Sequence, residues 1–282
     1  MPRLPRLSLL IPVTLLAAHA QWLNQPTPGT PRTKDGKPNL VAKAPRLAGK
    51  PDLSGVWQVE APAKGEVERL IGRDNLAVGL VPGDDLNAFS RYFYNILADF
   101  KPEESPMRPE AAEIMRNRRK GMETPDERCL PVGVPRAELI GFPFKIVQTP
   151  GLIVILYEAD NTRRQIYMDG RKLPVDPNPV WLGYSVGRWE GDTLVADSAG
   201  FSDKVWLDVI GHPASESLRV QERFHRRDFG HMDLQITVTD PKMYTKPITI
   251  NVVQLLLPDS DIFEYFCTEN EKDRGHIIRS AE

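Results

Sequence analysis

The sequence has no run of apolar residues long enough to cross a bilayer, which takes about 20 of them. Its longest apolar run, Leu7 to Ala18, is shorter and is interrupted by Pro12. This run follows Arg3 and Arg6 and ends in Ala18-His19-Ala20, which is the order of a secretory signal peptide with its cleavage site. We therefore expect cleavage after Ala20 (residues 1–20), a periplasmic or secreted protein, and no stable membrane anchor.

Cysteine is also scarce: among 282 residues there are only Cys129 and Cys267. Their spacing matches neither a C-x-x-C redox motif nor a zinc pattern. A redox or metal-binding thiol pair is the alternative reading. Because disulfides persist in exported proteins, we predict one structural disulfide between the two.

An excess of positive charge is missing as well. The chain has 36 Lys and Arg against 38 Asp and Glu, and without Arg3 and Arg6 the balance is 34 against 38, a net charge of −4. This balance argues against nucleic acid or an anionic membrane as the main partner. A small-molecule ligand remains open, and the sequence does not indicate an oligomeric state.

Residues 21–50 are rich in Pro, Lys and Gly and hold few large apolar residues. Such a segment buries too little apolar surface to offset its ordering entropy. We predict an extended arm or linker, with a tether to the cell wall or to a partner as the alternative. Residues 51–282 then form a single domain.

A helical insertion is expected at about residues 66–128. Apolar residues recur at steps of three and four from Leu86 to Phe100, which indicates an amphipathic helix. A second helix is predicted from Pro109 to Lys120, with acidic residues near its start and basic residues near its end.

After Cys129 the pattern changes to short β-rich runs separated by turn signals. Short turns between consecutive runs predict an antiparallel meander, and closure into a barrel would remove its two unpaired edges. The predicted strands are Phe144 to Gln148, Leu152 to Glu158, Arg163 to Met168, Trp181 to Trp189, Thr193 to Asp197, Leu218 to His225, His231 to Thr239, Ile248 to Leu256 and Ile262 to Cys267.

The stretch PDLSGVWQVE places Gly55 and Trp57 at the start of an earlier strand. A strand-opening G-x-W before a meander resembles the first strand of the lipocalin and calycin barrels. The resemblance implies that the glycine permits close packing and that the tryptophan plugs the closed end. The expected fold is mainly β: an antiparallel meander closed as a lipocalin-like barrel, with the helical insertion after the first strand.

A second resemblance covers most of the mature chain. The blocks CLPVGVPR, RRQIYMDGR, WLGYSVGRWEGDTLV, RFHRRDFGH and YFCTENEKD are similar to those of a secreted bacterial family of uncharacterised function. Members of that family often carry histidine in place of Ala214 and asparagine in place of Ser202. This departure weakens the loop around these positions as a full catalytic set.

Three carboxylates fall on otherwise apolar strand faces. Alternation places Glu158, Glu222 and Glu264 in line with large apolar residues, so all three are expected to point into one cavity. Buried carboxylates must be paired or neutralised, and Arg164 is an available partner, as is Arg219 on the other face of its strand. They are either structural ion pairs that close the barrel ends, or an acid/base group or ligand anchor with a raised pKa.

The longest connection of the meander, residues 200–213, contains Trp206, Asp208 and His212. Long loops of this composition often act as lids or binding loops, although Trp206 could simply plug the barrel mouth. We predict that its part from Trp206 to His212 closes over a barrel mouth into which Glu222 and Glu264 project.

A divalent metal is an alternative at the hairpin that His225 and His231 flank, with Glu222 as a third ligand. No H-x-H or H-E-x-x-H spacing supports it, so we expect neither a metal nor another cofactor.

Two main classes of function follow. The first is a binding module whose cavity takes a small lipophilic or aromatic ligand; the candidate contacts are Glu222, Glu264, Glu158, Arg164, Trp206, Tyr167 and His231. The second is a cofactor-independent hydrolase or lyase, with catalytic candidates His212, Glu222 and Asp208. A structural envelope protein is a third reading, which a cavity closed by side chains would favour.

Overall fold

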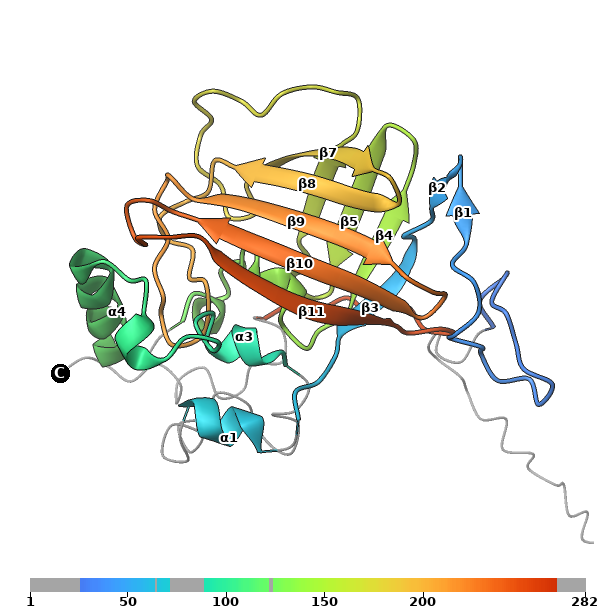
Figure 1. Ribbon diagram of the computed structural model, residues 1–282, viewed down its shortest axis with the longest axis horizontal. Coiled ribbons are helices and arrows are strands. Elements are labelled where there is room, and N and C mark those ends of the chain that lie inside the picture. The colour runs from blue at the N-terminus through green and yellow to red at the C-terminus, as the bar shows by residue number, and fades with distance from the viewer. Residues whose placement is uncertain (1–25, 64, 72–88, 122–123, 268–282) are drawn as a thin grey trace, which may run out of the picture.

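The computed structural model is a closed barrel of nine strands, in which residues alternate between the inside and the outside (Figure 1). It describes residues 26–63, 65–71, 89–121 and 124–267. The order around the barrel is β10-β11-β3-β4-β5-β6-β7-β8-β9. Strands that are consecutive in the sequence therefore lie side by side, and the last strand, β11, pairs with the first, β3. The strands are β3 (Gly55–Val59), β4 (Phe144–Gln148), β5 (Leu152–Tyr157), β6 (Arg163–Tyr167), β7 (Tyr184–Glu190), β8 (Thr193–Ala199), β9 (Arg219–Arg226), β10 (His231–Thr239) and β11 (Ile248–Leu256).

This architecture confirms the predicted fold class: mainly β, closed, with a helical segment after the first strands. One pair departs from the antiparallel meander, because β6 and β7 run parallel. Parallel neighbours require a connection that returns to the starting end, and residues 168–183 make that return.

The last predicted strand, Ile262 to Cys267, is wrong. These residues form no strand and cross the outside of the barrel as an irregular segment. The barrel already closes where β11 pairs with β3, so no free edge remains for a further strand.

The G-x-W stretch shapes one end of the barrel. A Cβ on Gly55, whose φ is +144°, would lie 2.6 Å from Cδ1 of Leu256. Trp57 is completely buried, and its indole N–H donates to the Leu53 carbonyl at 2.9 Å. The guanidinium of Arg226 lies over the Trp57 ring, 4.9 Å from its centroid, at this end of the barrel, which we call the Trp57 end.

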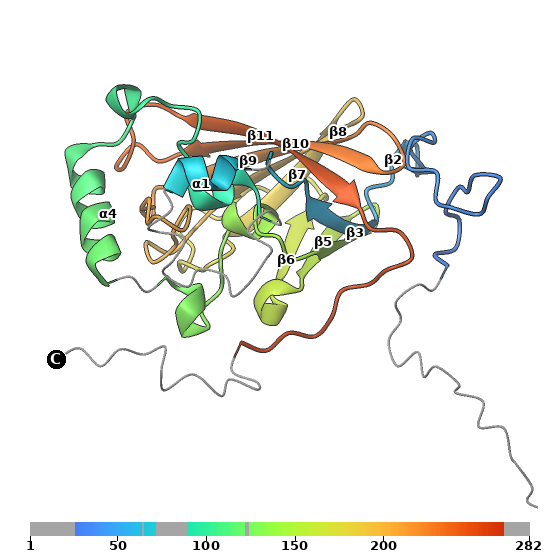
Figure 2. The same ribbon diagram turned by 90° about the horizontal axis from the view of Figure 1, so that it is seen from below.

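The helices gather on one side of the molecule, toward the other end of the barrel (Figures 1 and 2). They are α1 (Glu66–Ile71), α3 (Arg91–Tyr94) and α4 (Pro109–Gly121), with 3-10 turns η2 (Pro102–Glu104), η3 (Asp126–Arg128), η4 (Arg136–Glu138) and η5 (Ala159–Asn161). The prediction of a helix from Pro109 is confirmed.

The predicted helix from Leu86 to Phe100 is not continuous. Its first three residues lie outside the described residues, and the rest contains only α3 before Asn95 turns to extended backbone. Asp208 accepts the N–H of Ile96 at 2.7 Å, so a distant loop takes a backbone donor that a longer helix would have used. The described apolar residues of this pattern still pack into or against the core, although only Phe93 does so from a helix.

The described part of the N-terminal arm packs against the Trp57 end. Arg32 forms a salt bridge with Asp259, and the N–H groups of Phe229 and Gly230 donate to carbonyls of the arm at 2.7 Å. Two short strands, β1 (Arg46–Leu47) and β2 (Lys50–Pro51), pair with each other. In the part of the chain that the structure describes, no helix is long and apolar enough to cross a membrane.

Candidate functional site

The barrel interior contains a charged cluster in the half away from the Trp57 end. Arg164 enters from β6 and Glu222 from β9, each at an inward position of its strand. Glu138 enters from η4, in the segment that covers this end of the barrel. We call Arg164, Glu138, Glu222 and Tyr157 the interior cluster.

Arg164 is the hub of this cluster, and its guanidinium uses all five N–H groups within the protein. Nη1 donates to Oε1 of Glu138 and to Oε1 of Glu222, each at 3.0 Å, and Nη2 donates to Oε2 of Glu222. The remaining donors reach the hydroxyls of Ser185 at 2.9 Å and Ser198 at 2.8 Å. Arg164 therefore has no N–H left for a ligand.

Burial changes the protonation of the cluster. Glu138 and Glu222 are completely buried and Arg164 is 2% exposed. Burial and then the nearby Glu222 raise the pKa of Glu138 to about 8, against the lowering effect of Arg164. Burial also raises the pKa of Tyr157, whose hydroxyl donates to Glu138. Burial and the neighbouring Glu222 therefore favour the neutral form of Glu138, while Arg164 donates hydrogen bonds to both carboxyl groups.

Glu138 is the site residue that the sequence did not reveal. It lies on a short turn directly after the CLPVGVPR block, where strand alternation gives no information. The side-chain amide of Gln254 donates to the Glu138 carbonyl at 2.8 Å, which ties this turn to β11. Oε2 of Glu138 and Oε1 of Gln254 have no hydrogen-bond partner among the described residues.

The loop of residues 200–213 lies over the same end of the barrel. Oδ1 of Asp208 accepts the N–H groups of Gly211 and His212 at 3.0 and 3.1 Å, and Oδ2 contacts Nδ1 of His212. The Val209 N–H donates to the carbonyl of Phe93 at 3.0 Å, so the loop also packs on α3. The guanidinium carbon of Arg118 lies over the Trp206 ring, 4.9 Å from the ring centroid.

The catalytic candidates thus fall into two networks. Asp208 and His212 contact each other, whereas Glu222 pairs with Arg164. None of the contacts between described residues joins His212 to Glu222.

Two of the three predicted inward carboxylates lie elsewhere. Glu264 is exposed, because its segment is not a strand and alternation does not apply to it. Glu158 follows β5 and accepts the Phe263 N–H at 2.8 Å. The sequence LIVILY of β5 is apolar on both faces, so alternation could not select the buried one, which is that of Ile153, Ile155 and Tyr157.

The other binding candidates are also outside the barrel. The Tyr167 hydroxyl donates to Gln165, and Arg171 lies over its ring at 3.7 Å. His231 contacts Asp228 at 2.7 Å. Among the described residues no group of three His, Cys, Asp or Glu side chains is placed to hold a metal.

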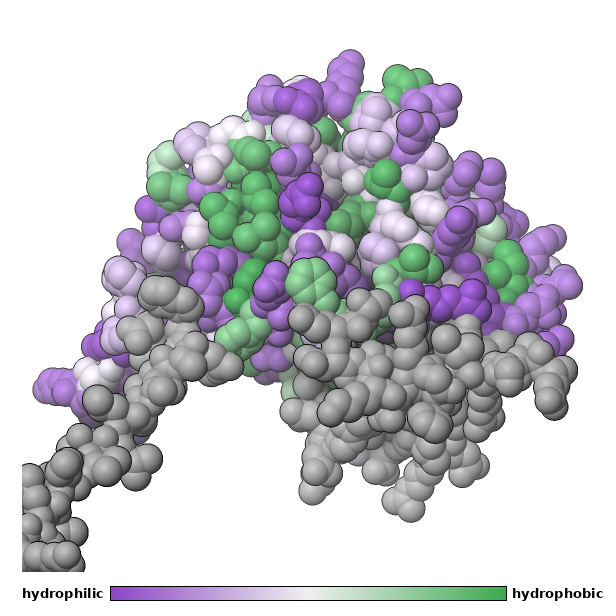
Figure 3. Space-filling model, turned by 180° about the vertical axis from the view of Figure 1, so that it is seen from behind, coloured by the Kyte–Doolittle hydropathy of each residue, from purple (hydrophilic) through white to green (hydrophobic). Residues whose placement is uncertain are grey.

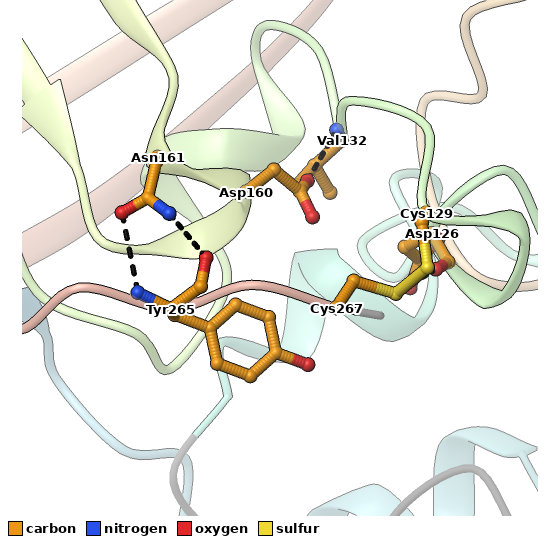
Figure 4. The surroundings of a disulfide bond; sticks show 7 residues. All are labelled: Asp126, Cys129, Val132, Asp160, Asn161, Tyr265 and Cys267. Atoms are coloured by element: carbon orange, nitrogen blue, oxygen red, sulfur yellow. Dashed lines mark hydrogen bonds between the residues drawn. A yellow bond between two sulfur atoms is a disulfide. The ribbon is translucent and has the colours of Figure 1, made fainter. Parts of the chain in front are cut away.

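The predicted disulfide is confirmed: Cys129 and Cys267 are bonded, with their Cα atoms 5.4 Å apart. Figure 4 shows the residues around it, with Asn161 hydrogen-bonded to the Tyr265 backbone and Asp160 to the Val132 N–H. The C-terminal segment is therefore fastened to the chain that enters η4.

The described residues form clefts on the outside of the barrel wall, including the following three. One of 520 Å³ lies between α3 and the outer face of β9 to β11, and one of 560 Å³ lies between the arm and the Trp57 end. The third, of 750 Å³, lies on the outer face of β7 to β10 under residues 170–173.

Comparison with known proteins adds no relative: no protein-family model matches the chain, and no curated protein matches it. The functional conclusion therefore depends on the geometry of the barrel and its clefts.

Proposed function

We propose that the protein is an exported scaffold whose barrel interior is a structural core and whose ligands bind on the outer surface. The observation that carries this proposal is that all five N–H groups of Arg164 donate hydrogen bonds within the protein, to Glu138, Glu222, Ser185 and Ser198. A ligand anchored at this guanidinium would have to displace a buried carboxylate, which is costly.

The ends of the barrel support the same proposal. At the Trp57 end, Trp57 and the Arg226 above it are buried, and η4, α3 and the loop that carries Asp208 lie at the other end. The disulfide fits an oxidising compartment, as does the predicted signal peptide. Binding of a small lipophilic ligand inside the barrel stays a prediction, and the three outer clefts favour the surface.

Dye uptake distinguishes a core from a pocket. N-phenyl-1-naphthylamine, a neutral apolar dye, is titrated into the folded protein and into Glu222→Gln, with the exposed Glu216→Gln as the matched control. We expect no saturable fluorescence rise in any of them, and a melting temperature several degrees lower only in Glu222→Gln, since Arg164 loses its charged partner. Saturable binding of one dye per chain, lost in a folded Glu222→Gln, would overturn the proposal.

One observation favours the enzymatic alternative. The Asp208 carboxylate contacts Nδ1 of His212, as a residue that orients a general base does. The same carboxylate accepts three backbone N–H groups, which a purely structural role explains equally well. Hydrolysis of p-nitrophenyl acetate that disappears in a folded His212→Gln variant would favour the enzyme, whereas no hydrolysis above background would count against an esterase.

A further inference from the structure

The 750 Å³ cleft is the most strongly charged of the three. It lies on the outer side of β7 to β10, where β8, β9 and β10 face the viewer in Figure 1. Its rim is formed by Gly170 to Leu173, in the return connection between the parallel strands. By contrast, Figure 3 shows apolar side chains gathered on the back of the barrel, the side of β4 and β5.

Positive charge dominates the lining of this cleft. Four cations line it, Arg171, Lys172, Arg188 and Arg219, against one acid, Asp197. Arg171 and Arg188 are paired with acidic side chains, but Lys172 and Arg219 are exposed and form no ion pair among the described residues. The chain as a whole carries a net charge of −2, so the cleft opposes the charge of the protein that contains it.

Neutral hydrogen-bonding groups lie between these charges. Gln221, Thr237 and Thr239 project from β9 and β10 at alternate, outward positions. Gln221 donates to Oδ1 of Asp197 at 2.8 Å, and Arg188 donates to the other oxygen of the same carboxylate. These contacts hold the floor of the cleft in place before any ligand arrives.

We infer that this cleft binds an acidic polysaccharide, with Lys172 and Arg219 on its carboxylates and the Gln and Thr side chains on its hydroxyls. The inference rests on the proposed function, because it requires the outer surface to be the binding surface. Charge complementarity selects a polyanion. Sites for single-stranded nucleic acid stack bases on aromatic rings, and the described lining residues of this cleft include none.

Native electrophoresis in gels containing alginate, a carboxylated polysaccharide, tests the inference, with neutral dextran as the parallel gel. The variant is Lys172→Gln/Arg219→Gln. The control is Lys34→Gln/Lys43→Gln, which changes the net charge equally on the arm at the Trp57 end. We expect alginate alone to retard the full-length protein, less so as salt is added. The cleft variant should bind at least about tenfold more weakly, since each lost charge-assisted hydrogen bond costs a factor of that order, and the control should match the wild type.

Other outcomes would overturn the inference. These are no retardation by alginate, equal loss in both double variants, or tighter binding of single-stranded DNA through the same two cations. The dye titration is independent: saturable uptake lost in Glu222→Gln would overturn the proposed function whatever the gels show. If no dye binds inside the barrel and alginate does not retard the protein, the polysaccharide inference is wrong but the proposed function stands.

Discussion

At the scale of the residue, Arg164 lies between two carboxyl groups where little water can screen them. One guanidinium can balance one of these acids, so the second is cheaper to bury as a neutral group. Glu138 takes that role: burial and the neighbouring Glu222 raise its pKa from 4.5 to about 8. Arg164, Glu222 and Tyr157 are the titratable groups that act on it.

Glu138 should therefore make stability depend on pH. Between 4.5 and about 8 the folded protein holds a proton that the unfolded chain releases, so the free energy of unfolding falls as pH rises through this range. The slope from this group is at most about 1.4 kcal/mol per pH unit. Urea unfolding of Glu138→Gln across the same range should lack this part of the slope, while the exposed Glu104→Gln keeps it. Equal slopes in all three proteins would contradict the assignment.

The sequence predicted only part of this cluster. Glu222 was predicted because it lies on the apolar face of a strand with clear alternation, and Arg164 only as an available cation to pair with a buried carboxylate. Glu138 was not found because it projects from a turn, and turns have no periodic face. Glu264 was wrong because its strand does not exist, and Glu158 because β5 is apolar on both faces.

At the scale of the element, β3 depends on a residue without a side chain. Gly55 has φ of +144°, and a Cβ there would lie 2.6 Å from the Leu256 side chain. Both features oppose any larger residue, because the backbone conformation is unfavourable and the core on that side is closed.

Gly55→Ala should consequently lower the free energy of unfolding by roughly 1 to 3 kcal/mol. Gly151→Ala is the matched control, since a Cβ there meets no atom within 4 Å and φ is not positive. Chemical denaturation of both variants checks the expectation. A similar loss in both would mean that backbone entropy, and not the contact with Leu256, sets the cost.

Most elements followed from the sequence, and the exceptions have a common cause. The turns between β4 and β5 and between β7 and β8 fall where glycine and proline signals placed them, and β10 and β11 have the predicted bounds. The parallel pair and the broken helix before Phe100 depend on distant partners: β7 pairs with β6 across a long return, and Asp208 binds Ile96. Local periodicity contains no information about such partners.

At the scale of the whole molecule, the segment after β11 fastens the two ends of the barrel together. It leaves the Trp57 end and runs along the outside of the barrel, where Asp261 pairs with Lys145 at 2.9 Å. Phe263 then donates to Glu158, and the segment ends in the disulfide to Cys129 (Figures 2 and 4). Cys129 lies just before the chain that inserts Glu138, so the bond holds the covered end closed.

Removing the disulfide should lower the free energy of unfolding by more than its few local contacts suggest. The bond links residues 138 apart, and in the chain-entropy model closing a loop of this size restricts the unfolded chain by about 5 kcal/mol. Cys129→Ser/Cys267→Ser should therefore unfold at markedly lower denaturant, and dithiothreitol should bring the wild type to the same midpoint while leaving the variant unchanged. Thiol labelling of the denatured, non-reduced wild type should find neither cysteine free. If the variant and the oxidised wild type unfold at the same midpoint, the bond does not stabilise the fold, and the closed end must be held by the contacts of Asp208 and Glu138 alone.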